Sequence, residues 1–517
     1  MEPFFSPILN ALIKHAQNRP AGFHVPGHRY GQALQQDFQL KEPAAHPAVW
    51  FTSIMQLDVT ELSSTDDLHH PEASILEAQQ LAARTFGAEE TFFLVGGSTS
   101  ANIALLLTLC EPGEKIIVQR NVHKSVINGL KLSGAVAVFL SPQVGQRSGL
   151  ATIPTVEQVG DALRLYPDAK AVLLSSPNYY GMGVRLKPYA ELVHKSGIPL
   201  VVDEAHGAHY GFHPDLPQSS LADGVDAVVQ SAHKTLPTLT MGAMLHVQGN
   251  RIDREILRQS LAMIQSSSPS FPILASIDIS RAMIDSLGNR MFEQSIAAAA
   301  SFRDWLRQQS TAIEEIEYDI MAMETDESTT HYTDPLRVVI YDSSSRLSGF
   351  ELQRRLEQYG CFAEMADPRY VVLVFGIQAS LEDNEKLQHA IEVINEECQS
   401  SAKASHKEDN AYAQMYISER TATVTAGISD PVSFSRERFN NQHVERINLT
   451  EAQLRISAEM VTPYPPGIAI LNPGEIITSM NIEQIRLLSE AGAKFQGAAD
   501  PTMQTIAVYH KKDENNV

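Results

Sequence analysis

Short apolar runs alternate with segments of helical periodicity between residues 91 and 230, and this alternation constrains the fold more than any other feature of the chain. The apolar runs lie at 91–95, 115–119, 136–140, 171–175, 199–203 and 227–230. Candidate helices lie between them at 98–110, 156–165 and 187–196. Strands that alternate with helices form a mostly parallel sheet, and because such strands are buried on both faces they read as continuous Val, Ile and Leu. The sequence therefore predicts an α/β fold with ligands bound at the carboxyl ends of the strands.

The length of the chain predicts more than one domain, since 517 residues exceed a single compact core. A short amphipathic helix from Pro7 to Gln17 is expected in an N-terminal arm, and the patterns beyond residue 290 predict a second, smaller α/β unit. A polar stretch at 399–420 reads as a linker. The predicted units are the arm, a large ligand-binding domain, a small α/β domain and a C-terminal domain, at 1–50, 51–290, 291–400 and 401–517.

Charge and cysteine content exclude several classes of protein. The 61 acidic and 40 basic residues give a net charge of −21, which repels nucleic acids and anionic membranes and fits a cationic substrate. Cys110, Cys361 and Cys398 lie far apart, which argues against a disulfide framework and a thiolate metal cluster. The chain starts without signal-peptide features, and no apolar stretch reaches roughly 18 residues. We expect a cytoplasmic protein.

Two residues that follow buried runs suggest chemistry with pyridoxal 5'-phosphate. The run at 199–202 ends in Asp203, and Lys234 follows the run at 227–230. A lysine just past a buried strand can form an imine with the cofactor aldehyde, and a carboxylate at a strand end can keep the pyridine nitrogen protonated. Each residue also has a structural interpretation, because a lysine in a loop and an aspartate after a strand are both common.

A glycine-rich turn follows the first predicted strand and could bind the cofactor phosphate. Gly96 and Gly97 precede Ser98, Thr99 and an apolar helix, so backbone N–H groups and two hydroxyls meet the positive end of the helix dipole. An ordinary capped turn is the alternative. The spacing of a nucleotide-binding P-loop is absent, so the sequence gives no support for triphosphate binding.

Histidines near the same predicted edge have two interpretations. His123 follows the run at 115–119 and could stack on a flat ring, or it could be a surface histidine of a loop. The segment from Asp203 to His209 contains His206 and resembles a metal site in composition, but its spacing does not fit the helical arrangement of a zinc hydrolase. We expect no metal. Ala205 is small enough to let a ring lie flat against the chain.

These motifs occur in the order found in the Orn/Lys/Arg decarboxylases, which are fold-type-I pyridoxal phosphate enzymes. The central ones are Gly96-Gly-Ser-Thr-Ser-Ala-Asn102, Asn121-Val-His-Lys-Ser125, Asp203-Glu-Ala-His-Gly-Ala-His209 and Ser231-Ala-His-Lys-Thr-Leu236. Flanking ones are His24-Val-Pro-Gly-His28, Asp58-Val-Thr-Glu61, Asp66-Asp-Leu68, Ser266-Ser-Ser-Pro-Ser270, Ala363-Glu-Met-Ala-Asp367 and Thr462-Pro-Tyr-Pro-Pro-Gly467. The chain resembles this family along nearly its whole length.

The resemblance implies a role for each matching position. It implies that Lys234 carries the cofactor, that Asp203 lies beneath the pyridine nitrogen, and that His123 and Ala205 cover the two faces of the ring. It also implies a phosphate site and a homodimer, or a larger homo-oligomer, whose active site is shared. The phosphate site would comprise Ser98, Thr99, Ser231 and His233, with Ser267 or Ser268 of the neighbouring subunit. Either Lys234 or His206 would return a proton to the α-carbon.

The chain departs from the family pattern at two positions, where Ala232 replaces a frequent Thr and Ala469 a frequent Pro. The first change puts details of the phosphate contact in doubt. The His-Val-Pro-Gly-His motif lies so near the start that the chain resembles the short, wingless form, typified by bacterial arginine decarboxylases of polyamine metabolism.

The predicted substrate is a basic amino acid, with L-arginine first and lysine or ornithine as alternatives. Acidic side chains would receive its cationic end, and the candidates are Asp66, Asp67, Glu364 and Asp367. An aminotransferase or aldolase of the same fold would need an arginine for the α-carboxylate, and no arginine stands out at a motif. A non-catalytic binding protein is a further alternative, against which the intact Lys234, Asp203 and His123 argue.

Overall fold

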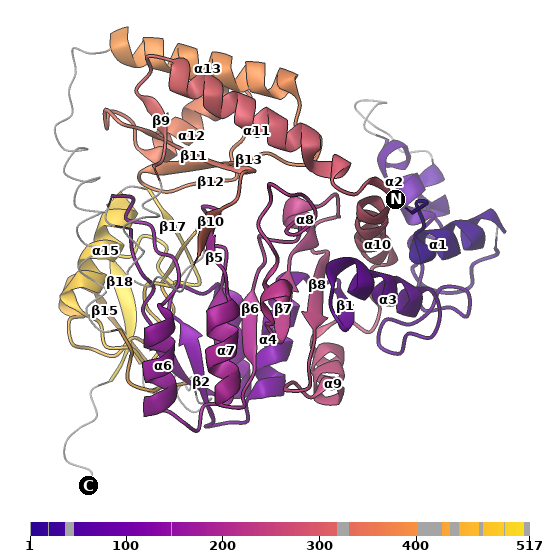
Figure 1. Ribbon diagram of the computed structural model, residues 1–517, viewed down its shortest axis with the longest axis horizontal. Coiled ribbons are helices and arrows are strands. Elements are labelled where there is room, and N and C mark those ends of the chain that lie inside the picture. Colours follow the sequence, from indigo (N-terminus) through magenta and orange to yellow (C-terminus); the bar gives the residue numbers. More distant parts are fainter. Residues whose placement is uncertain are drawn as a thin grey trace.

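The computed structural model has a central sheet, a smaller domain above it, and the two terminal regions beyond the left and right edges of the sheet (Figure 1). It describes residues 2–18, 20–36, 46–145, 147–317, 330–400, 427–434, 444–464, 469–490 and 492–510. The predicted linker at 399–420 lies outside the described residues, except for its first two positions, which end a helix. Among the helices in these ranges, none is long and apolar enough to cross a membrane.

Eight strands form the central sheet in the order β1-β8-β7-β6-β4-β2-β3-β14. Their bounds are β1 Glu90–Leu94, β2 Lys115–Gln119, β3 Val136–Leu140, β4 Val172–Ser175, β6 Leu200–Asp203, β7 Ala227–Gln230, β8 Ala243–Val247 and β14 Val432–Ser433. The neighbouring strands β3, β2, β4, β6 and β7 are parallel to one another. Strand β8 runs antiparallel to β7, and β14 runs antiparallel to β3. The predicted mostly parallel sheet is confirmed, and all six predicted strands occur in it. The antiparallel β8 was not predicted, because the alternating pattern stops at β7.

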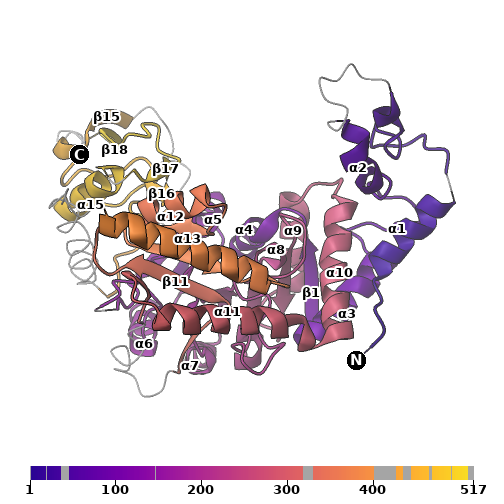
Figure 2. The same ribbon diagram turned by 90° about the horizontal axis from the view of Figure 1, so that it is seen from above.

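Different helices cover the two faces of the sheet, since successive residues of a strand point to opposite sides. Ile116 and Val118 of β2 pack in one core with α4 (Gly97–Leu109), α5 (Lys124–Ser133) and α9 (Arg254–Ile264). Ile117 packs on the other face with α6 (Val156–Leu165) and α7 (Lys187–Lys195). Figure 2 shows these two helix layers on either side of the strands. The sheet is therefore buried on both faces, which explains the continuous apolar runs.

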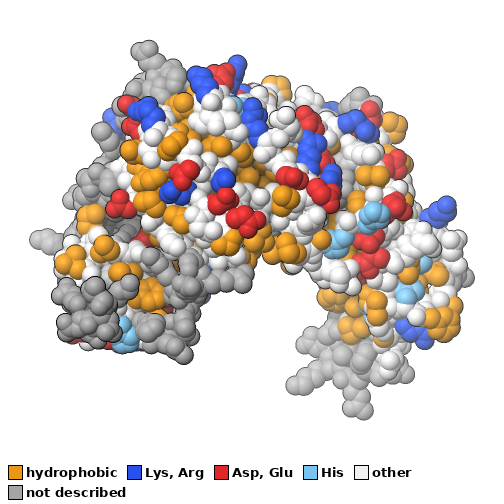
Figure 3. All heavy atoms as spheres, turned by 90° about the horizontal axis from the view of Figure 1, so that it is seen from below, with side chains coloured by type: hydrophobic (Ala, Val, Ile, Leu, Met, Phe, Trp, Pro, Cys, Tyr) orange, Lys and Arg blue, Asp and Glu red, His pale blue; other side chains and the backbone are white. Residues whose placement is uncertain are grey.

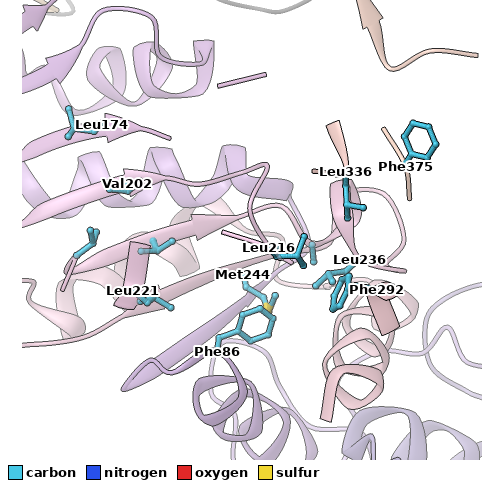
Figure 4. Packing of buried hydrophobic residues seen from close by; sticks show 14 of the residues in the cluster. Phe86, Leu174, Val202, Leu216, Leu221, Leu236, Met244, Phe292, Leu336 and Phe375 are labelled. Atoms are coloured by element: carbon cyan, nitrogen blue, oxygen red, sulfur yellow. The ribbon is translucent and has the colours of Figure 1, made fainter. Parts of the chain in front are cut away.

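The small domain is a four-stranded antiparallel sheet in the order β12-β13-β11-β9. Its elements are β9 Ile313–Glu315, β11 Arg337–Asp342, β12 Met365–Ala366 and β13 Tyr370–Val374, with α11 Arg290–Gln308, α12 Gly349–Gln358 and α13 Leu381–Ser400. Its core continues into the large domain, because Leu174 and Val202 share a buried cluster with Leu336 and Phe375 (Figure 4). The two sheets are therefore fixed against one another by apolar packing.

A two-stranded ribbon joins the small domain to the carboxyl side of the large sheet. It pairs β5 (Met182–Val184) with β10 (His331–Thr333), and it lies between the two domains in Figure 1. Gly181 precedes it with φ +84°, and a Cβ on this glycine would lie 2.8 Å from the Cβ of Arg337. Only glycine permits this backbone and this close approach. The ribbon therefore brings the start of β11 to the strand ends of the large domain.

The two terminal regions project from the same side of the large domain, and a wide indentation separates them (Figures 2 and 3). The arm has α1 Pro7–Gln17 and α2 Pro47–Met55 with the short η1 Gln32–Gln35, and it packs beside α3 Ser74–Phe86 and α10 Phe271–Leu287. The C-terminal region has β15 Val444–Asn448, η7 Leu449–Glu451, β16 Thr462–Tyr464, α15 Ser479–Glu490, β17 Lys494–Gln496 and β18 Thr505–Tyr509. The predicted helix from Pro7 to Gln17 is confirmed as α1.

Candidate active site

A cavity at the carboxyl ends of β1, β2, β6 and β7 contains most of the residues singled out in the sequence. Two adjoining hollows form it, and the larger has a volume of about 330 Å³. Four residues line both hollows, namely Ser98, His123, Tyr179 and Lys234. The smaller hollow also contains Asp203, Ala205 and His206, and the larger also contains Thr99, Ser231, His233 and Glu364. Side chains that lie far apart in the sequence therefore meet at one edge of the sheet.

Asp203 ends β6 and is held rigidly by its neighbours. It is only 4% exposed, and its Oδ2 accepts a hydrogen bond of 2.9 Å from Asn102 Nδ2. Its Oδ1 accepts a bond of 3.2 Å from the backbone N–H of Ala205. Asn102 lies in α4 and also donates to Ser125 Oγ at 2.9 Å. This buried carboxylate can hold a protonated ring nitrogen in place, because a charge-assisted hydrogen bond is strong where water is excluded.

His123 caps the start of α5 and is fixed by that role. Its Nδ1 accepts a hydrogen bond of 3.2 Å from the backbone N–H of Ser125 and lies 2.8 Å from Ser125 Oγ. Desolvation by burial lowers the pKa of His123 to about 4, although Asp203 acts in the opposite direction. The imidazole ring is therefore neutral at physiological pH, as suits a ring that stacks on a flat heteroaromatic ligand.

Lys234 lies in α8 (Ala232–Thr235), one short turn after β7. Its Nζ lies 3.0 Å from His206 Nε2 and 5.6 Å from the centre of the Tyr179 ring. Desolvation by burial lowers the pKa of Lys234, and Arg337 lowers it further, whereas Asp203 and Glu364 raise it. The net result is a lysine whose neutral, nucleophilic form is more accessible than that of a solvated lysine.

The opposite end of the cavity presents hydrogen-bond donors suited to a phosphate group. Gly97 adopts φ +72° at the start of α4, and Ser98 and Thr99 follow it in the first turn. Ser231 Oγ lies on the same hollow, is buried, and has no hydrogen-bond partner among the described residues. A buried hydroxyl without a partner is costly, and a phosphate oxygen would satisfy it. The residues therefore fit pyridoxal phosphate, with hydroxyls for an anion on the larger hollow, an aspartate on the smaller one and a lysine that lines both.

His233 and Ala232 lie between Ser231 and Lys234 in the chain. The Nδ1 of His233 lies 3.0 Å from the carbonyl oxygen of Gly242, so it donates there, and desolvation lowers the pKa of His233. Ala232, where the family often has Thr, is fully buried at the start of α8. Among the hydroxyls of this segment, Ser231 Oγ is thus the one that lines the hollow.

Arg337 is a residue next to the site that the sequence analysis missed. It begins β11 in the small domain, is 2% exposed, and its Nη2 donates to His206 Nδ1 at 2.8 Å. Asp334 Oδ2 lies 4.0 Å from its Nε. Arg337 is not part of any motif singled out in the sequence, so its contact with His206 is seen only in the folded chain. The only sequence signal is a charged residue at the start of an apolar run, and nothing local indicates its distant partner.

The four acidic candidates for the substrate end lie in different surroundings. Glu364 lines the larger hollow. The Asp66 carboxylate accepts hydrogen bonds from the backbone N–H groups of Asp67, Glu72, Ala73 and Ile75. The Asp67 carboxylate accepts one from the backbone N–H of His69. The Asp367 carboxylate accepts hydrogen bonds from the Tyr180 hydroxyl and from two backbone N–H groups. The structure therefore brings Glu364 to the cavity, whereas the other three carboxylates are engaged elsewhere and are not among its lining residues.

Comparisons with known proteins identify the family to which this fold and site correspond. The model of the Orn/Lys/Arg decarboxylase major domain matches residues 6–383, and the model of the family's C-terminal domain matches residues 413–514. The chain belongs to the Orn/Lys/Arg decarboxylase family.

Relatives cover nearly the whole chain. An uncharacterized Bacillus subtilis protein, YaaO, is 35% identical over 99% of this chain and 100% of its own length. The arginine decarboxylase of Bacillus subtilis is 33% identical over 97% of both chains. Among solved structures, constitutive lysine decarboxylase of Escherichia coli superposes with a TM-score of 0.80 at 21% identity, covering 98% of this chain and 82% of that one. The predicted family and fold class are confirmed.

Proposed function

We propose that this protein decarboxylates L-arginine to agmatine and carbon dioxide with pyridoxal 5'-phosphate as its cofactor. The observation that carries the proposal is the position of Lys234 and Asp203 on one cavity, at the ends of adjacent strands. Family membership supports the reaction class, and the similarity to an arginine decarboxylase over 97% of both chains supports the substrate. Lysine and ornithine are the alternative substrates.

The proposed roles follow from the contacts in the cavity. When bound, the cofactor supplies an electron sink for the pair left behind as carbon dioxide departs. Lys234 would hold it through its amine, Asp203 would keep its ring nitrogen protonated, and His123 and Ala205 would lie against its two faces. The phosphate would bind Ser98, Thr99, Ser231 and His233. Each of these side chains is already fixed or aimed at the cavity, which lowers the cost of ordering them on binding.

We propose that Glu364 receives the cationic end of the substrate. It is exposed and lines the larger hollow, and its charge acts on both Lys234 and His233. A guanidinium presents a flat fork of donors that matches a carboxylate in two parallel hydrogen bonds. Among the four acidic candidates, Asp66, Asp67 and Asp367 have weaker support, because their carboxylates already accept hydrogen bonds from the chain.

We further propose that the working unit is at least a homodimer in the cytoplasm, acting in polyamine formation. The arm exposes large apolar side chains at Phe23, Val25, Val49, Trp50 and Phe51, of which Phe23 is 95% exposed. Apolar groups gathered on a projecting arm are typical of a protein interface. The indentation between the arm and the C-terminal region offers room for a second copy (Figure 3). Ser267 and Ser268 are exposed, so they are available to a neighbouring site.

The test is to supply the purified protein with pyridoxal phosphate and, in parallel, L-arginine, L-lysine and L-ornithine, and to measure amine products and carbon dioxide. Agmatine as the main product supports the proposal. Cadaverine or putrescine as the main product would change the assigned substrate to lysine or ornithine and would leave the assigned reaction unchanged. A keto acid without carbon dioxide would instead support an aminotransferase. Lys234→Ala protein is the control for contaminating activity.

A further inference from the structure

A line of polar side chains leads from the cavity into the buried boundary between the two domains. Lys234 Nζ lies 3.0 Å from His206 Nε2, and His206 Nδ1 lies 2.8 Å from Arg337 Nη2. Arg337 lies beside Asp334, whose Oδ2 is 3.1 Å from His209 Nε2. The exposed fractions of His209, Asp334 and Arg337 are 0%, 2% and 2%, so water does not separate these groups from one another.

The chemistry of the guanidinium group decides where the proton of His206 lies. A guanidinium has only N–H donors and does not lose its proton in proteins. At 2.8 Å from Arg337, the Nδ1 of His206 must therefore be the nitrogen that accepts. A neutral imidazole has one donor and one acceptor nitrogen, so its proton must be on Nε2, the nitrogen that faces Lys234. Lys234 Nζ then accepts this proton's hydrogen bond, which requires a neutral amine.

Building on the function proposed above, we propose that Arg337 is a positioning residue that fixes His206 as the Nε2–H tautomer. His206 thereby serves as a permanent hydrogen-bond donor toward the nitrogen of Lys234. The same contact prevents His206 from becoming an imidazolium, because a proton on Nδ1 would point at the N–H groups of Arg337. His206 is then a fixed donor and does not act as the acid that protonates the α-carbon.

The surrounding charges agree with this assignment. Desolvation holds the pKa of His206 well below its usual value, and Lys234 and Arg337 lower it further. Burial alone would raise the pKa of Asp334, but His209 and Arg337 outweigh it and lower the pKa. Asp334 thus stays charged and compensates Arg337. The titratable or charged groups facing this line of residues are His123, His233, Asp203, Glu364, Tyr210 and Tyr332.

The direct test reads the tautomer in the cofactor-free, full-length protein. Protein labelled with ¹⁵N-histidine would give separate ring-nitrogen signals for protonated and unprotonated nitrogens, and His206→Gln would identify the pair that belongs to His206. We expect a protonated Nε2 and an unprotonated Nδ1 in the wild type. A proton on Nδ1, or a doubly protonated ring near neutral pH, would overturn the proposal without any variant of Arg337.

A second measurement follows Lys234 through the pH dependence of its reductive methylation, quantified on the peptide by mass spectrometry. In Arg337→Met, we expect methylation of Lys234 at neutral pH to fall several-fold, because the positive charge is lost and His206 can turn its acceptor nitrogen toward an ammonium. Arg337→Lys retains the charge and should lie nearer to the wild type. Arg303→Met is the matched control, since Arg303 is a half-buried arginine that binds Glu315 in the small domain.

Equal methylation of Lys234 in Arg337→Met and wild type would contradict the proposal, as would an equal loss in the Arg303 control. If Arg337→Met does not fold, Arg337→Lys and the wild-type tautomer still decide the question. Neither measurement needs turnover. A protein that makes no amine but shows the predicted tautomer would therefore reject the proposed function while keeping the role of Arg337.

Discussion

The cavity has two walls that differ in origin and in charge. One wall is the carboxyl edge of the large sheet, with Asp203, His123 and Lys234, each of which follows its own strand. The other wall comes from the small domain, where Glu364, the residue before β12, lines the larger hollow and Arg337 of β11 contacts His206. The sheet edge holds histidines that burial keeps neutral, whereas the small domain contributes a carboxylate that lines the cavity and a permanent cation that contacts His206. If the proposed roles hold, the sheet edge supplies the reacting groups, while the small domain sets their protonation and binds the substrate's cationic end.

The largest effect is expected from Lys234→Ala, which removes the reacting amine of the sheet edge. Turnover should fall by about 10⁴-fold or more, the scale seen when a covalent catalyst is deleted. The visible absorbance of bound pyridoxal phosphate should change with it. Lys187→Ala is the control, because Lys187 is 70% exposed and lies outside the cavity. Retention of more than a tenth of the activity in Lys234→Ala would assign the covalent role to another group.

Asp203→Asn should have the next largest effect, because an amide cannot hold a protonated ring nitrogen as a carboxylate does. We expect kcat to fall by about 10²- to 10⁴-fold, the usual contribution of a positioned proton-transfer partner. Steady-state kinetics and the cofactor spectrum measure it. An unchanged spectrum combined with wild-type kcat would show that Asp203 has only a structural role at the end of β6.

Glu364→Gln tests the small-domain wall. Losing a charge-assisted contact to the substrate should raise KM for arginine about ten- to a hundredfold, with a smaller change in kcat. Asp66→Asn is the matched comparison. Burial alone would raise the pKa of Asp66, but its hydrogen bonds with backbone N–H groups outweigh burial and lower the pKa, so this variant should reduce stability and leave KM unchanged. A rise in KM in Asp66→Asn, without a rise in Glu364→Gln, would show that Glu364 does not bind the substrate's cationic end.

The smallest effect expected is on the pH dependence of the free energy of unfolding. Desolvation lowers the pKa of His246 in β8 to about 3, while an unfolded chain takes up this proton near the ordinary value of 6.5. The unfolded state therefore binds more protons below pH 6.5, and the free energy of unfolding falls as the pH is lowered. Between pH 6.5 and 5.5, one such histidine accounts for about 1 kcal/mol. His246→Gln should make the pH dependence of urea unfolding shallower by that amount, and an unchanged slope would contradict it.

The difference between the walls also separates what the sequence could predict from what it could not. Asp203, His123 and Lys234 each follow an apolar run, and the carboxyl ends of parallel strands share one edge, so local patterns were sufficient to place them together. Arg337 reaches His206 through pairing across 131 residues. Its position depends on the ribbon of β5 and β10 and on Gly181, and a single sequence carries no signal for that pairing. Likewise, only the fold shows that Glu364 lines the cavity whereas Asp66 and Asp367 do not.

The central claim is that Lys234 holds the cofactor, and borohydride reduction of the protein loaded with pyridoxal phosphate tests it most directly. Reduction fixes the cofactor to the lysine that carries it, and peptide mass spectrometry then locates the modified residue. We expect one phosphopyridoxyl group per chain, on Lys234. A stoichiometric adduct on any other lysine, or none at all under saturating cofactor, would contradict it.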